Sequence, residues 1–161
     1  MGFIDKVGGE MRFKRTLSAW LATLCCLLAC GGISAQAKEL KFEAILVWAT
    51  DSEKSPDPHQ RPVSADVRKK LKELPLKWAN YFEVNRKRLV VAQGGSEKAE
   101  LSEKCKLQVA DVDGTHIEIS LIGKGEPVLK RIQPLLRGEM LVLGGNAPDE
   151  TGWLVVLKRL E

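Results

Sequence analysis

The sequence predicts a mainly β fold, a sandwich or partly open barrel of about seven or eight mostly antiparallel strands, with one short helix near residues 64–74. Apolar and polar side chains alternate with a period of two over most of residues 38–161. Turn signals recur every ten residues or so. A single segment of this region repeats its apolar side chains at helical spacing. Residues 38–161 are therefore expected to form one β-rich domain.

The first element is a strand. On one face every residue is apolar, and this face holds Leu40, Phe42, Ala44, Leu46 and Trp48. The other face holds Lys41, Glu43, Ile45, Val47 and Ala49. One face is wholly apolar and the other becomes apolar toward its end, as expected of a strand that enters the core. Residues 51–62 follow with three prolines, which fix φ and lack the amide donor, so they predict an irregular loop.

The helix is predicted from its caps and its spacing. Ser64 stands at a suitable N-cap and Asp66 in the first turn. Apolar side chains then recur at positions i, i+4 and i+7, and they are Val67, Leu71 and Leu74. Pro75 ends the pattern.

The next two predicted strands, residues 78–84 and 89–92, flank the polar segment 85–88, which we interpret as a hairpin tip. Gly94-Gly95 closes that unit. Residues 99–101 suggest a short edge strand. Five aromatic residues fall within the strand periodicity, which favours a place in the core: Trp48, Trp78, Tyr81, Phe82 and Trp153.

A second antiparallel hairpin is predicted around Asp113-Gly114, the strongest turn signal in the chain. Alternating residues before it include Cys105, and those after it begin at Ile117. His116 is out of phase with the apolar residues and should face solvent.

Three further segments complete the pattern. Gly123-Lys124-Gly125 is a turn before a strand over 128–132, which ends at Pro134. A strand over 140–143 precedes residues 144–148, read as a loop. The last strand, 153–157, is almost continuously apolar and is expected to be buried on both faces.

The N-terminus resembles a cleavable bacterial secretion signal over residues 12–37. A basic stretch is followed by an uncharged apolar stretch shorter than the roughly 20 residues that span a bilayer. Ala35-Gln36-Ala37 offers small residues to a signal peptidase, which predicts cleavage after Ala37 and a periplasmic or secreted protein with no transmembrane span in the mature chain. Met11 is the alternative start.

Cys30 offers a different outcome. Leu27-Leu28-Ala29-Cys30-Gly31 resembles a lipobox, in which Cys30 would be acylated and would anchor an envelope lipoprotein. Leu28 departs from that pattern, because the position usually carries a small residue. Three of the four cysteines lie before residue 38, so cleavage after Ala37 leaves Cys105 alone and allows no intramolecular disulfide. Its place in the strand pattern suggests a small buried side chain.

The charge of the mature chain is nearly balanced. Residues 1–37 hold four of the 25 basic residues and two of the 21 acids, which leaves 21 against 19, a net charge of +2. This argues against a nucleic-acid partner, which requires a strong basic excess. No cofactor is expected either, since Gly94-Gly95 and Gly144-Gly145 lie between predicted strands and lack the Lys-Ser/Thr pair of a phosphate loop.

Two groups of side chains are candidate sites. Asp51, Asp57 and His59 in the loop form a weak candidate for a metal site or for a small secreted hydrolase or metal-dependent enzyme. Two basic clusters suggest an acidic envelope protein or an anionic envelope surface as partner. They are Arg68, Lys69 and Lys72 on the helix, and Arg86, Lys87 and Arg88 at the predicted tip.

No acid/base constellation stands out in the sequence, so we expect a non-enzymatic binding or accessory module of the cell envelope. The loop enzyme and the envelope lipoprotein anchored through Cys30 are the alternatives.

Overall fold

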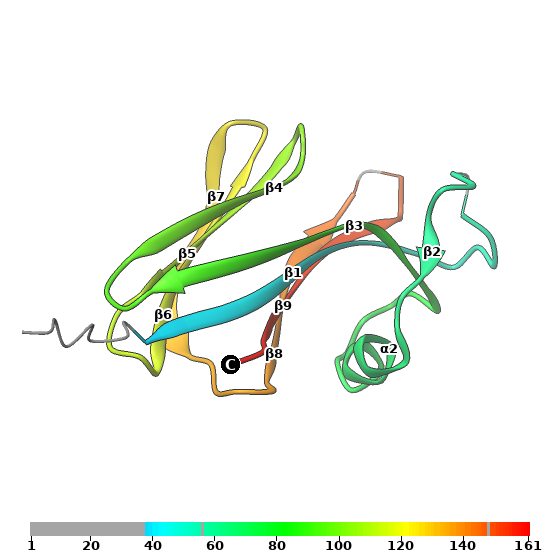
Figure 1. Ribbon diagram of the computed structural model, residues 1–161. Coiled ribbons are helices and arrows are strands. Elements are labelled where there is room, and N and C mark those ends of the chain that lie inside the picture. Colours follow the sequence, from blue (N-terminus) through cyan, green and yellow to red (C-terminus); the bar gives the residue numbers. More distant parts are fainter. Residues whose placement is uncertain (1–37, 56, 148) are drawn as a thin grey trace, which may run out of the picture. The chain divides into compact units, whose positions relative to one another are not determined.

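The computed structural model describes residues 38–161 apart from positions 56 and 148, and within them it forms nine strands and one helix (Figure 1). The predicted mainly β class is therefore confirmed. The structure has more strands than the seven or eight predicted, and the additional strand β2 has only two residues. The elements are β1 Glu39–Thr50, β2 Arg61–Pro62, α2 Ala65–Lys72, β3 Asn80–Ala92, β4 Ser96–Ser102, β5 Cys105–Asp111, β6 His116–Gly123, β7 Glu126–Pro134, β8 Met140–Asn146 and β9 Gly152–Arg159. The secretion signal, the start at Met11, cleavage after Ala37 and acylation of Cys30 lie outside the described residues.

The strands form two antiparallel sheets. Sheet A has the order β2-β3-β1-β9-β8 and sheet B the order β4-β5-β6-β7. The chain passes from sheet A to sheet B between β3 and β4, and returns between β7 and β8. Side chains that alternate along the strands of both sheets meet in one apolar core, because successive residues of a strand point to opposite faces. This core includes Phe42 and Val155 from sheet A and Leu107 and Ile119 from sheet B.

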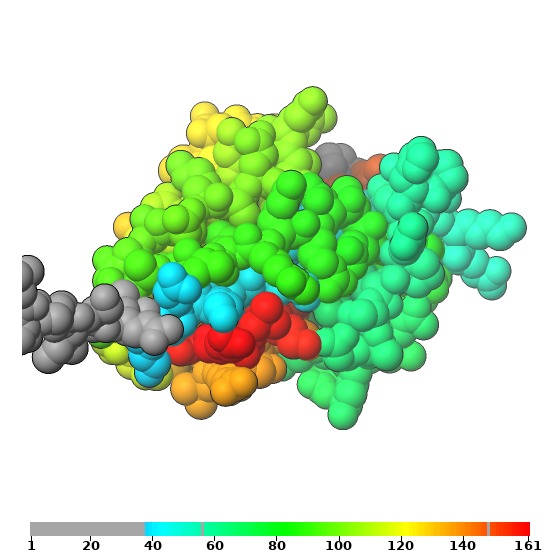
Figure 2. Space-filling model, viewed as in Figure 1, coloured from blue at the N-terminus to red at the C-terminus, as the bar shows by residue number. Residues whose placement is uncertain are grey.

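A second apolar cluster lies on the opposite face of sheet A, where α2 packs. Ile45 and Val47 of β1 and Val156 of β9 pack there against Val67 and Leu71 of the helix. Both central strands are thus buried on both faces, which confirms the prediction made from their apolar residues. Figure 2 shows the blue-green surface of α2 and the preceding loop gathered at one side of the molecule, away from the yellow β6–β7 turn.

The helix is confirmed at almost the predicted bounds. Ser64 occupies the N-cap position, but its Oγ donates to Oδ1 of Asp66 at 2.6 Å rather than accepting from a backbone amide. The other oxygen of Asp66 accepts from Nζ of Lys158 at 2.6 Å, which ties the first turn of α2 to β9. Leu71 is fully buried.

The hairpin predicted at residues 85–88 is wrong. β3 runs without interruption through these residues, which pair with Leu46 to Glu43 of β1. Arg86 is accommodated within the strand because Glu43 and Glu83 both accept from its guanidinium. Lys87 and Arg88 are exposed on the part of β3 that forms the edge of sheet A. Charged side chains are common at such an edge because they discourage pairing with another chain.

Two segments predicted as irregular are partly strand. β8 continues through Gly144-Gly145 to Asn146, because Gly144 lets the backbone approach Trp153 and Leu154 of β9 more closely than any side chain permits. Residues 61–62 pair with the edge of β3, a position that tolerates proline.

The predicted Asp113-Gly114 turn is confirmed, with Gly114 at a φ of 82°. Buried Asp111 joins this turn to the β3–β4 turn, because its carboxylate accepts from the amides of Gly94 and Gly114 at 2.8 and 2.6 Å. Arg159 is also buried, and its guanidinium donates to the carbonyls of Leu135 and Gly114 at 2.8 and 3.0 Å.

Candidate functional site

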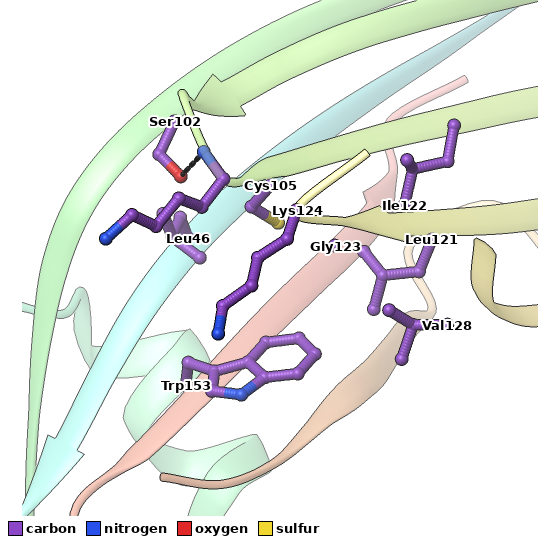
Figure 3. A pocket seen from close by; sticks show the side chains of 10 residues that line it. Leu46, Ser102, Cys105, Leu121, Ile122, Gly123, Lys124, Val128 and Trp153 are labelled. Carbon is purple, nitrogen blue, oxygen red and sulfur yellow. Dashed lines mark hydrogen bonds between the residues drawn. The ribbon is translucent and has the colours of Figure 1, made fainter. Parts of the chain in front are cut away.

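An apolar cavity of about 380 Å³ lies between the two sheets (Figure 3). Leu46 and Trp153 contribute its sheet A wall. Cys105 and Leu121 contribute the facing wall of sheet B, and Val128 of β7 lies beside them. The remaining lining residues are Ser102, Lys104, Ile122, Gly123 and Lys124. We call this the inter-sheet cavity.

Irregular strand pairing surrounds the inter-sheet cavity. Within the described residues three register shifts interrupt the ladders, next to Leu46 of β1, Ser102 of β4 and Leu121 of β6. Each of these residues lines the cavity. Because a bulge bends its strand and redirects a side chain, the three shifts affect the direction of the strands next to the cavity.

Val128 shows how one of these bulges shapes the wall. Leu121 pairs with Leu129 and Ile122 with Pro127, so Val128 between them has no partner opposite it on β6. A side chain at Gly123 would come within 2.7 Å of Cγ2 of Val128. The glycine therefore leaves the space that Val128 fills at the edge of the cavity.

Two lysines lie at the end of sheet B that borders the cavity, Lys104 in the β4–β5 turn and Lys124 in the β6–β7 turn. The amide of Lys124 donates to the carbonyl of Lys104 at 2.9 Å, which holds the two turns side by side (Figure 1). Figure 3 shows the side chain of Lys124 directed toward the indole of Trp153. Over the described residues neither lysine forms an ion pair, and the cavity lining contains no acid. We call Lys104 and Lys124 the lysine pair.

Cys105 is buried, as the strand pattern predicted, and its sulfur belongs to the sheet B wall of the cavity. Burial raises the pKa of the thiol, because a thiolate is poorly solvated there. The thiol is therefore protonated at neutral pH, and it is a weak nucleophile.

Of the loop candidates Asp51, Asp57 and His59, the two aspartates accept hydrogen bonds from backbone amides. Oδ1 of Asp51 accepts from the amide of Ala79 at 3.0 Å, and Oδ1 of Asp57 accepts from the amide of His59 at 2.8 Å. Residues 38–161, without 56 and 148, hold no group of three His, Cys, Asp or Glu side chains arranged for a metal ion. His116, predicted to face solvent, is exposed and contacts Asp113 through Nδ1 at 2.7 Å.

The two predicted basic clusters occupy different elements. Arg68, Lys69 and Lys72 line a shallow depression of about 610 Å³ beside α2. Arg86 instead lies within β3 among glutamates, and the correction to the hairpin removes the predicted basic tip. No hydrogen bond or ion pair within the described part of the chain joins the two clusters.

The lysine pair and the inter-sheet cavity are absent from the sequence prediction. Trp153 was expected in the core, yet it is only partly buried and lines the cavity. The available signal was modest: Lys104 and Lys124 stand in turns that border successive strands, which places them at the same end of a meander.

Comparison of the chain with protein-family models, with curated proteins and with solved structures yields no match. Among the described helices none has the length and apolar character needed to cross a membrane.

Proposed function

We propose that this protein is a non-enzymatic binding module that holds a small apolar ligand in the inter-sheet cavity. The apolar lining of that cavity carries the proposal. Its volume of about 380 Å³ falls within the roughly 300–1,000 Å³ typical of small-molecule sites. Burying an apolar ligand against Leu46, Leu121 and Trp153 is favourable by about 25 cal/mol for each Å² removed from water.

Binding is favoured over catalysis by the chemistry of the lining. General acid/base work requires a group that exchanges a proton near neutral pH. The candidates in the cavity are a lysine pair at exposed turns and a thiol whose pKa burial raises. The lining is therefore better suited to holding a ligand than to transforming one.

The cell envelope is the proposed location of this module. The secretion signal predicted over residues 12–37 supports it. Mass spectrometry of the mature N-terminus tests this part of the proposal. A free Lys38 amine supports cleavage after Ala37, whereas an acylated Cys30 indicates a lipoprotein and an uncut Met1 or Met11 contradicts export through a cleaved signal.

Blocking the cavity tests the binding site. Isothermal titration with 1-decanol, a neutral apolar probe, should give saturable binding to the wild-type protein at one site. Val128→Trp places a large side chain against the cavity and should abolish that binding. Ile132→Trp is the matched control, because Ile132 lies on the same strand at nearly equal exposure, 57% against 54% for Val128, and outside the lining.

Two results would overturn the binding proposal. One is the absence of decanol binding to a folded wild-type protein. The other is equal binding to Val128→Trp and Ile132→Trp when circular dichroism shows that both variants keep the β fold.

A further inference from the structure

From the lysine pair we infer the class of ligand: a single-chain anionic amphiphile, whose apolar chain fills the inter-sheet cavity and whose head group contacts Lys104 and Lys124. This inference rests on the proposed function. It adds the charge, the polarity and the orientation of the ligand, none of which follows from an apolar cavity alone.

The charge of the head group follows from what surrounds the cavity. Both cations of the lining are lysines, and no carboxylate of the lining neutralises them. The backbone hydrogen bond between their turns keeps Lys104 and Lys124 adjacent, at 2.9 Å between amide nitrogen and carbonyl oxygen. An anionic head group at the mouth of the cavity is attracted by the positive charges of both lysines.

The orientation of the ligand follows from where charge and apolar surface lie. Lys104 and Lys124 are exposed, whereas Cys105 and Leu121 deeper in the wall are buried. Lysine carries its charge on a flexible apolar stem, so an ammonium group stays in water while its methylenes cover the cavity. A head group at the lysine pair therefore keeps its hydration, and the chain reaches toward Leu46 and Trp153.

The volume limits the ligand to one chain of moderate length. At roughly 30 Å³ for each water-sized group, a cavity of about 380 Å³ holds about a dozen heavy atoms. One chain of about ten carbons fits, and the paired long chains of a membrane phospholipid do not. A free single-chain anionic amphiphile is therefore the expected form.

Three ten-carbon probes separate charge from apolar binding: decanoate, 1-decanol and decyltrimethylammonium, titrated calorimetrically below their micelle concentrations. Decanoate should bind about tenfold more tightly than decanol, as expected for two partly exposed ion pairs. Added salt should reduce this difference. The cationic probe should bind more weakly than decanol.

Charge reversal then assigns the head group to the lysine pair. Lys104→Glu with Lys124→Glu should weaken decanoate binding by at least about tenfold and leave decanol binding within about threefold. The matched control is Lys98→Glu with Lys106→Glu. Lys98 and Lys106 belong to β4 and β5 but do not line the cavity. The control should leave both affinities unchanged.

The outcomes keep this inference distinct from the proposed function. Equal affinity for decanoate and decanol, or a lysine-pair reversal that changes neither, overturns the inference and leaves the binding proposal standing. No binding of any probe overturns both. A third outcome is that the protein binds phosphatidylglycerol vesicles but not free decanoate, and that Val128→Trp does not reduce the vesicle binding. This outcome indicates a lipid surface as the source of the anion and also overturns the inference.

Discussion

Replacing Arg159 with methionine tests the polar contacts that hold the two sheets together. The guanidinium is buried, with 6% of the residue exposed, and it donates to the carbonyls of Leu135 at 2.8 Å and Gly114 at 3.0 Å. A third bond, from Nε to the carbonyl of Glu161, is longer at 3.2 Å and lies at the chain end. Methionine keeps most of the volume but has no donor.

The expected loss follows from the two shorter bonds. A buried carbonyl left without a donor costs about 1–3 kcal/mol, and the removal of a buried cation recovers part of that through relieved desolvation. We therefore expect Arg159→Met to lower the free energy of unfolding by about 2–4 kcal/mol. Urea denaturation followed by circular dichroism measures this quantity.

Lys158→Met is the control, because Lys158 is the neighbouring residue of β9 and its ion pair with Asp66 is partly exposed. It should cost no more than about 1 kcal/mol. If Arg159→Met unfolds at the same urea concentration as the wild type, the hydrogen bonds of the guanidinium to Gly114 and Leu135 do not stabilise the fold.

Two further substitutions test the fold. Gly144→Ala should destabilise the protein by about 1–3 kcal/mol or more, because the added Cβ meets the carbonyl oxygen of Trp153. The control Gly145→Ala should cost clearly less in thermal denaturation, because its Cβ comes no closer than 4.0 Å to that tryptophan. Equal losses of stability would contradict the close approach. Hydrogen bonds from Lys158 and then Ser64 hold the pKa of Asp66 well below its ordinary value of 3.8. A carboxyl with a lowered folded pKa stabilises above its unfolded pKa and loses this contribution as the pH falls. Asp66→Asn should thus cost about 0.5–1 kcal/mol at pH 7 and progressively less in urea denaturation between about pH 5 and pH 2; a loss that does not change with pH would refute the ionic contribution.

The sequence predicts the strands wherever an apolar period of two meets a turn signal. β5 and β6 are examples, since Cys105 and Ile117 begin clear alternations and Asp113-Gly114 lies between them. Buried strands such as β9 are equally evident, because Leu154 to Leu157 are apolar on both faces. Both signals are local, and a local signal needs no knowledge of distant contacts.

Errors arise where a distant residue changes the meaning of a local pattern. Residues 85–88 look like a polar hairpin tip until Glu43, which is 43 positions before Arg86, supplies a partner at 2.7 Å. Gly144 likewise indicates a loop until β9 requires a close backbone approach. Tertiary pairing overrides local propensity in both cases.

The candidate site could not be predicted for the same reason. Its walls come from Leu46, Cys105, Leu121, Val128 and Trp153, which are far apart in the chain. Each taken alone is an ordinary apolar strand residue. The register shifts next to the cavity depend on strand pairing and leave no local signature in the sequence.

The location of decanoate binding tests the central claim most directly. In a titration followed by two-dimensional ¹H–¹⁵N NMR, the amides of Cys105, Gly123 and Trp153 should shift saturably together, and those of Arg68 and Lys69 in α2 should stay in place. Saturable shifts at the inter-sheet cavity would support the binding function. Shifts confined to α2 would contradict it, and the absence of shifts with both decanoate and decanol would do the same.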